Sequence, residues 1–372
     1  MHCTNWAAAF ALVLPVAGTQ AAAPQPTELE FKEQIQRLER AKDKTTRLES
    51  LRWFNRHAGA DHAALALPAL ERCVRDADEM EVRRDAVLVL ALIAKRRDKP
   101  CPLSVVEALL DKEDEVRWQA GASTALFQAF APGSVEVLLR CARSDNAGLR
   151  GDRLLILARA AGKDRKVLDT IEKAKQDRAF EVRHSAHCAL FRATNRLDEF
   201  LVYILRVRED PDAVLRPAPE DAELRKQERA MRNLFLIGDS MQLIEWSEKR
   251  ADELAPLLMK WLEDKSPVLR RGAANLIGAT AVKVDLPASG KLEGDWFSKL
   301  APYLEKDVLP DPLKKDTPTE KRPQKSRVAI RLEKLQVDSR LRKMRDNDPD
   351  RSVREAARFA LERLASVQEK KP

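Results

Sequence analysis

The chain has 372 residues, of which 34% are charged, 44% are hydrophobic and only 5% are aromatic, and its formal net charge is +8. It holds 12 glycines, about half of what ordinary usage of roughly 7% would give. Doubly wound sheets and β-barrels need glycine in their turns and β-branched residues in their strands. A composition rich in Ala, Leu, Glu and Arg therefore predicts an all-α protein, and its apolar content excludes a disordered chain.

The N-terminus has the pattern of a secretory signal peptide. Residues 1–31 contain no Lys or Arg, and an apolar run over residues 6–18 is followed by small residues and prolines. This pattern predicts a signal peptide, residues 1–21, cleaved after Ala21. The run is shorter than the ~20 apolar residues that span a bilayer, and no basic segment precedes it. We expect a periplasmic or secreted protein; a mis-assigned start or a frayed tail is the alternative.

One sequence pattern recurs along the chain. An acidic turn is followed by Val or Leu and then Arg, by Ala four residues after the Val, and by an apolar pair seven and eight residues after it. Its arginines are Arg83, Arg117, Arg150, Arg183, Arg270 and Arg354. The first four are 34, 33 and 33 residues apart. This spacing marks one face of an amphipathic helix, and a second apolar-periodic stretch precedes it, so each unit is predicted to be a helix pair that is stable only when stacked.

An Asp stands in the turn, five residues before the Val or Leu, in four of these copies: Asp111, Asp177, Asp264 and Asp348. There its carboxylate can cap the helix that follows. With these Asp and Val-Arg positions the chain resembles HEAT and HEAT-like repeat proteins, including the short repeats of bilin lyases. The resemblance covers residues 45–283 and 327–367. It implies an α-solenoid whose second helices line the concave side, with a ladder of Asp–Arg pairs between neighbouring repeats.

Two positions depart from the repeat pattern in the same copy. Ser144 replaces the turn Asp, and Arg153 replaces the Ala. The arginines that keep to the pattern could form a binding stripe, but the turn Asp residues favour a structural role for them. A network of bidentate pairs can orient adjacent repeats, although a single exposed pair contributes only ~0.2–1 kcal/mol.

The pattern defines the domain organisation. We predict an N-terminal segment with a charged helix at 22–44, a repeat array at 45–283 that is irregular at 206–240, a loop, short helix and charged Pro-rich linker at 284–326, and a C-terminal helix pair at 327–367.

The positive charge is concentrated near the C-terminal end. Residues 314–345 hold twelve Lys or Arg and four Asp or Glu, so this tract carries as much net charge as the whole chain. Such a tract attracts polyanions, here an anionic envelope polymer, or nucleic acid if the protein is not exported. No aromatic residue interleaves it for base stacking. The other interpretation is a solvated linker.

Chemistry-bearing motifs are scarce. There is no HExxH, GxSxG, P-loop or GxGxxG motif. His184, His187 and Cys188 fall on one predicted helix, but no third metal ligand is evident, so helix-surface or inter-helix polar residues are the favoured interpretation. Four of the five cysteines would remain after cleavage of the signal peptide, Cys73, Cys101, Cys141 and Cys188, and this even number is what disulfides require. Two of them, Cys73 and Cys141, lie two repeats apart, beyond the reach of a bridge, which favours buried thiols.

These observations predict a non-catalytic, exported scaffold without cofactor or metal. Its partner would be another macromolecule, foremost a protein, bound on the concave helical surface. By position, the candidate contact residues are Trp118, Arg153 and His184. A polyanion binder is the alternative, and a lyase-type or metal-dependent HEAT-like enzyme is less favoured.

Overall fold

The structure is a computed structural model that describes residues 25–209, 243, 246–281 and 324–367. Within these ranges the regular structure is helical, apart from isolated β-bridge residues such as the paired Cys101 and Phe130. The predicted all-α class is therefore confirmed. The predicted signal peptide and almost all of the irregular repeat and the linker lie outside the described residues. Among the helices that are described, none is long and apolar enough to cross a membrane.

The chain divides into two units, Met1–Asn195 and Arg196–Pro372. The division falls inside the segment 45–283 that the sequence predicts as one array.

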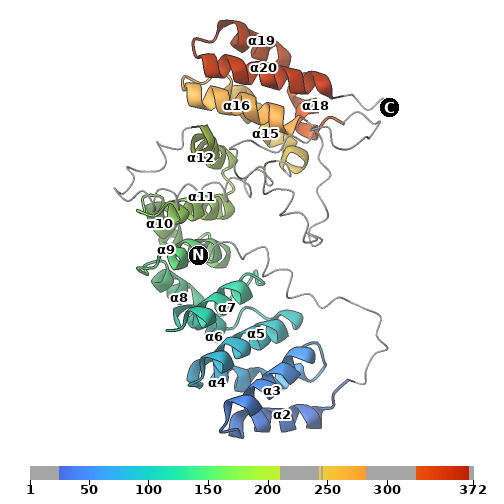
Figure 1. Ribbon diagram of the computed structural model, residues 1–372, viewed down its shortest axis with the longest axis vertical. Coiled ribbons are helices and arrows are strands. Elements are labelled where there is room, and N and C mark those ends of the chain that lie inside the picture. The colour runs from blue at the N-terminus through green and yellow to red at the C-terminus, as the bar shows by residue number, and fades with distance from the viewer. Residues whose placement is uncertain (1–24, 210–242, 244–245, 282–323, 368–372) are drawn as a thin grey trace. The chain divides into compact units, whose positions relative to one another are not determined.

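Unit 1 is a stack of antiparallel helix pairs (Figure 1). Its elements are α2 (Glu28–Arg40), α3 (Lys44–Arg56), η2 (Ala63–Ala66), α4 (Leu67–Asp76), α5 (Met80–Arg96), α6 (Leu103–Glu107), η3 (Ala108–Leu110), α7 (Asp114–Thr124), α8 (Ser134–Cys141), α9 (Ala147–Ala161), α10 (Arg165–Ala174) and α11 (Phe180–Thr194). The second helices α3, α5 and α7 pack in succession, and α9 packs on α11. The first helices α2, α4, α6 and α8 form the other layer. This is the helix-pair solenoid that the repeat predicts.

Unit 2 continues the same design with different connections. Its helices are α12 (Leu197–Glu209), α15 (Ala251–Trp261), α16 (Pro267–Thr280), α18 (Arg327–Lys334), α19 (Val337–Asn347) and α20 (Arg351–Ser366). Although more than forty residues separate α16 from α18, α16 packs closely on α20 and also contacts α12. Where the sequence predicts one helix before α20, the structure has α18 and α19. The break lies at Gln336, whose φ of 58° no α-helix accommodates.

The core is built from the apolar positions of the repeat. Val82, Ala86 and Leu90 of α5 are fully buried, as are Val353 and Ala357 of α20. Small side chains at the Ala position let successive second helices approach closely, because nothing larger than a methyl group stands between them. Burial of one Val or Leu side chain stabilises the fold by about 1.5–3 kcal/mol, so the stack is held by many modest contributions. Apolar burial thus accounts for the stability of the stack. The Asp–Arg pairs are left to fix the register between neighbouring helix pairs.

Candidate functional site

Each pattern arginine first binds its own turn, a role that the sequence analysis missed. Nη1 of Arg83 donates to the carbonyl oxygens of Ala77 and Asp78, both at 2.9 Å. The same two bonds, to the residues six and five positions earlier, recur at 2.6–3.2 Å at Arg117, Arg150, Arg183, Arg270 and Arg354. Carbonyls that follow a helix end lack intrahelical donors, so the arginine closes the turn of its own repeat.

Three of these arginines also reach a carboxylate of the next repeat. In each pair Nε and Nη2 donate to the two carboxylate oxygens at 2.7–3.0 Å: Arg83 with Asp111, Arg150 with Asp177, and Arg270 with Asp348. The side chains of Arg83 and Asp111 are only 6% and 12% exposed. A bidentate pair in this setting is stronger than an exposed ion pair and fixes the orientation of its partners. The bridges therefore hold neighbouring repeats in register.

The turn carboxylates also bond to the backbone of their own turn, which corrects an expectation. Oδ1 of Asp111, Asp177, Asp264 and Asp348 accepts from the backbone N–H two residues later, at 2.8–3.0 Å. That N–H belongs to the N-cap residue itself. The carboxylate thus stabilises the turn ahead of the helix and does not cap the helix N–H groups.

Electrostatics at the bridges follow from these bonds. Burial raises the pKa of Asp111, but the hydrogen bonds from Arg83 and from the Glu113 amide outweigh burial, so this pKa lies below its ordinary value. The pKa of Asp177 is lowered in the same way by Arg150. The hydrogen bond to Asp111 in turn raises the pKa of Arg83. Both partners are therefore held in their charged forms.

Not every ladder residue finds the partner that the resemblance implies. Arg117 faces the repeat in which Ser144 replaces the Asp, and its Nη2 donates instead to Asp114 of its own helix. Ser144 does keep the turn bond, because its hydroxyl oxygen accepts from the Asn146 amide at 3.3 Å. Arg354 lies in the last described repeat. The repeat that would supply a carboxylate to Arg183, and the one that would supply an arginine to Asp264, fall largely outside the described residues.

Arg153 lies inside the structure rather than on its surface, so its assignment as a contact residue is wrong. Its side chain is 2% exposed and lies against Gly121, where an added Cβ would stand 2.8 Å from Nη1. Within the described part of the chain, Nε and Nη1 have no hydrogen-bond partner, and Nη2 is 3.5 Å from the Arg117 carbonyl oxygen. Because a guanidinium takes the place of the pattern Ala, α9 packs only lightly on α7.

His184 is also buried, which corrects the second candidate. It is 4% exposed, and its Nε2 lies 3.5 Å from Sγ of Cys188. Burial lowers the pKa of His184 to about 4, and burial followed by the charges of Lys175 and His184 lowers the pKa of His187 to about 3. Both imidazoles are thus neutral at pH 7. Among the described residues no group of three His, Cys, Asp or Glu side chains could hold a metal ion.

The third candidate, Trp118, is on the surface. Its side chain on α7 is 46% exposed. It stands two residues after Val116, and Arg84 of α5 stands two residues after Val82. Because α5 and α7 pack side by side, Arg84 and Trp118 occupy equivalent positions on successive second helices. We call Arg84 and Trp118 the Trp118 row.

The cysteines of the described residues are thiols. Cys73, Cys101, Cys141 and Cys188 form no disulfide there, and Cys101 and Cys141 are buried. Burial raises the pKa of Cys73 to about 11 and that of Cys101 to about 12. These thiols are protonated at neutral pH, so they are poor nucleophiles.

The basic tract 314–345 is only partly a linker. Residues 324–345 are described and form α18 and most of α19. Arg331 pairs with Asp252 of α15, Arg340 pairs with Glu263, and Lys325 pairs with Glu333. Asp252 and Glu263 lie outside the tract and neutralise part of its charge, so the described residues 324–345 offer a polyanion less charge than the sequence alone indicates.

Comparisons with known proteins give likenesses of structure and none of sequence. No protein-family model matches the chain, and no curated protein matches it. A designed armadillo repeat protein is similar in structure at 18% identity, with 89% of this chain and 98% of that one covered and a TM-score of 0.25. The complex of Kap95p with RanGDP contains a similar chain at 14% identity, 91% and 41% coverage and a TM-score of 0.38. A chain of the CpcE and CpcF complex of phycocyanin lyase from Nostoc sp. PCC7120 gives 14% identity, 78% and 99% coverage and a TM-score of 0.35. These likenesses assign neither an activity nor a partner to this chain.

Replacing Arg150 tests the bridge. We expect Arg150→Ala to lower the free energy of unfolding of unit 1 by about 2–4 kcal/mol, because Asp177 is left nearly buried without its cation. Arg117→Ala is the matched control, since it loses the same two turn bonds but no inter-repeat carboxylate. Urea denaturation followed by circular dichroism measures both. Equal losses for the two variants would show that the bridge adds nothing.

Installing the missing bridge is the converse experiment. Ser144→Asp places a carboxylate opposite Arg117 and keeps the turn bond to Asn146, so we expect it to stabilise unit 1 by about 1 kcal/mol. Ser144→Asn, which has the same shape without the charge, should leave the melting temperature unchanged. The gain should disappear in the Arg117→Ala background; a gain that persists there has another origin.

The lowered pKa values predict a dependence on pH. A carboxyl whose folded pKa is depressed stabilises the fold above its unfolded pKa, ~3.9 for Asp, and loses that contribution as pH falls through the folded pKa. We therefore expect Asp111→Asn with Asp177→Asn to be less stable than the wild type at pH 7 and to lose less stability between about pH 4 and pH 2. Urea midpoints across this range measure it. Parallel curves for the two proteins would refute the assignment.

Proposed function

We propose that this protein is a non-catalytic scaffold that binds another protein on the exposed face of its second helices, the face that the repeat resemblance places on the concave side. The observation that carries the proposal is the exposure of Trp118 on a helix whose other side is fixed in the repeat stack. Stacked helical repeats present extended, fairly rigid surfaces of this kind. Trp and Arg are also the residue types most enriched among those that dominate binding energy, and the Trp118 row has one of each.

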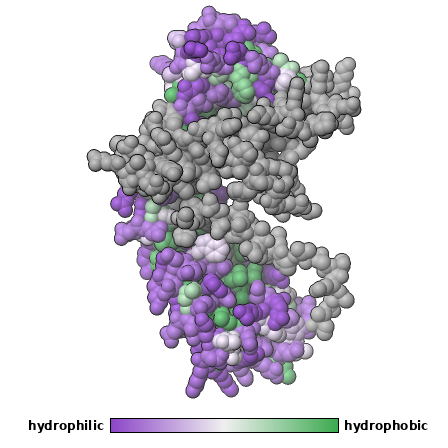
Figure 2. Space-filling model, in the orientation of Figure 1, coloured by the Kyte–Doolittle hydropathy of each residue, from purple (hydrophilic) through white to green (hydrophobic). Residues whose placement is uncertain are grey.

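The surface around the Trp118 row suits a protein partner of mixed polarity. On the face shown in Figure 2, hydrophilic side chains cover most of the described surface and apolar ones appear in small groups. The side chain of Arg84 is 38% exposed and pairs with the adjacent Asp85. Its aliphatic part is therefore available to a partner, while Asp85 neutralises part of its charge. A non-obligate interface is about as polar as the rest of a protein surface. The described surface has this character.

Substitution at the Trp118 row tests the proposal. The tagged full chain captures binding proteins from the compartment in which it is found, and the Trp118→Ala variant repeats the capture. We expect the specific partner to bind at least about tenfold more weakly to Trp118→Ala, as for a central aromatic contact. Leu65→Ala is the matched control, because Leu65 of η2 is a similarly exposed apolar residue away from the row. A partner lost equally from both variants, or from neither, would contradict the assigned surface.

We also propose that the protein acts outside the cytoplasm, on the basis of the pattern in residues 1–21. Export would make envelope or extracellular proteins the partners to search. Cell fractionation with sequencing of the N-terminus measures it: we expect a chain that starts at Ala22 in the periplasmic or secreted fraction. An intact N-terminus in the cytosolic fraction would overturn the proposed location and leave the Trp118 row to be tested on cytosolic partners.

A further inference from the structure

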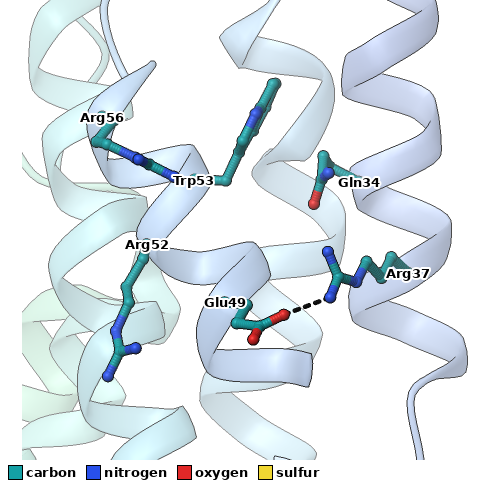
Figure 3. A pocket seen from close by; sticks show the side chains of 6 residues that line it. All are labelled: Gln34, Arg37, Glu49, Arg52, Trp53 and Arg56. Carbon is teal, nitrogen blue, oxygen red and sulfur yellow. Dashed lines mark hydrogen bonds and ion pairs between the residues drawn. The ribbon is translucent and has the colours of Figure 1, made fainter. Parts of the chain in front are cut away.

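A shallow pocket lies between α2 and α3, apart from the Trp118 row (Figure 3). Its volume is about 330 Å³, enough for a few residues of an extended chain. The lining side chains are Gln34, Arg37, Glu49, Arg52, Trp53 and Arg56.

Trp53 is held in place by other aromatic rings. Its ring centroid lies 4.8 Å from that of Phe31 and 5.4 Å from that of Phe54, both edge-to-face, and 4.6 Å from that of His57. Edge-to-face pairs of this kind add about 0.5–1.5 kcal/mol each beyond area burial. The wall formed by Trp53 is therefore preorganised, which lowers the entropy cost of binding against it.

The positive charge of the pocket is only partly compensated. Arg37 reaches from α2 to Glu49 on α3 and pairs with it (Figure 3). Arg52 and Arg56 lie one turn apart on α3, and neither makes a hydrogen bond or ion pair with any described residue. Like charges at this spacing repel each other, and the charge of Arg56 adds to burial in lowering the pKa of His57. An anion bound here would relieve this repulsion.

Gln34 sets a second requirement. Its side-chain oxygen is buried and has no hydrogen-bond partner among the described residues. An unsatisfied buried acceptor costs about 1–3 kcal/mol, so the pocket favours a ligand that also donates a hydrogen bond. A peptide with acidic side chains offers both kinds of group, since its backbone N–H donates and its carboxylates accept. A bare phosphate diester has no donor to give.

We propose that this pocket binds an acidic, extended segment of a partner protein. The carboxylates lie on Arg52 and Arg56, and a backbone N–H of the segment donates to Gln34. The chain's own residues 1–24 contain no Asp or Glu and do not offer this charge. The proposal goes beyond the Trp118 row, because it names a second surface and the chemistry of what it binds, and either surface can fail its test while the other passes.

A fluorescein-labelled peptide of about ten alternating Glu and Ala residues tests the proposal with the full chain, by fluorescence anisotropy. We expect Arg52→Gln with Arg56→Gln to weaken binding by at least about tenfold, the loss of one or two charge-assisted hydrogen bonds. Arg165→Gln with Lys166→Gln is the matched control. It removes two exposed positive charges from α10, far along the sequence from the pocket, and should change binding by less than about twofold.

Two further variants separate a peptide site from a general cationic surface. Gln34→Leu keeps every charge, and we expect it to weaken the peptide about three- to tenfold while leaving the binding of a labelled oligothymidine unchanged. Arg52→Glu with Arg56→Glu should lose the acidic peptide and gain a peptide of alternating Lys and Ala. Thermal melts check that each variant folds.

Three results would overturn the proposal. One is no binding of the acidic peptide to the wild type. Another is oligothymidine binding as tight as the peptide with no effect of Gln34→Leu, which would identify a site for any polyanion. The last is an equal loss in the pocket and α10 double variants, which would show that net charge alone attracts the peptide. Trp118→Ala should leave peptide binding unchanged, so a failure here is distinct from a failure of the scaffold surface.

Discussion

The fork of the pattern arginine is the interaction on which the repeat stack depends. A guanidinium has five N–H groups in one plane. In Arg83, Nη1 bonds two carbonyl oxygens of its own turn, while Nε and Nη2 bond the two oxygens of Asp111 in the next repeat. One side chain thus ties the end of one helix to the start of another and both to a neighbouring repeat. Lys could not replace it, because an ammonium is a point charge without the fork geometry.

The junction between α7 and α9 shows what happens where this interaction is missing. Two departures from the pattern meet there: Ser144 gives Arg117 no carboxylate, and Arg153 puts a guanidinium where a methyl group would let the helices close. A buried guanidinium without full hydrogen bonding is costly, and Gly121 provides the space that makes it tolerable. This junction has no arginine–aspartate bridge and lighter helix packing than the contact between α9 and α11. Arg159 of α9 spans it instead, by donating to the carbonyl oxygens of Ala125 and Phe127 at 2.9 and 3.0 Å. Ser144 and Arg153 together mark this junction as different from its neighbours, which neither substitution would show alone.

The sequence predicts the repeat well because its determinants are local and periodic. The spacing of Val82, Ala86 and Leu90 is enough to define a buried helix face, and the position of Asp111 is enough to place it in a turn. Periodicity gives the direction of a side chain but not how far its neighbours cover it. Arg153 and His184 were therefore expected on the surface although both are buried, because what covers them comes from other helices. The break at Gln336 was missed for another reason: a single left-handed residue leaves the apolar period on both sides nearly intact.

The number of N–H groups on the pattern arginines also limits where a partner can bind. At a bridged position, four of the five N–H groups of the arginine are already committed within the fold, so the recurring arginines of the ladder have little left with which to recognise a ligand. The most regular feature of the sequence is thus the least suited to specificity. Recognition has to come from positions that vary between repeats, where Arg84 is followed in register by Trp118, and from arginines outside the pattern, such as Arg52 and Arg56. In a repeat protein of this kind the residues that depart from the period, rather than those that define it, are the ones free to choose a partner.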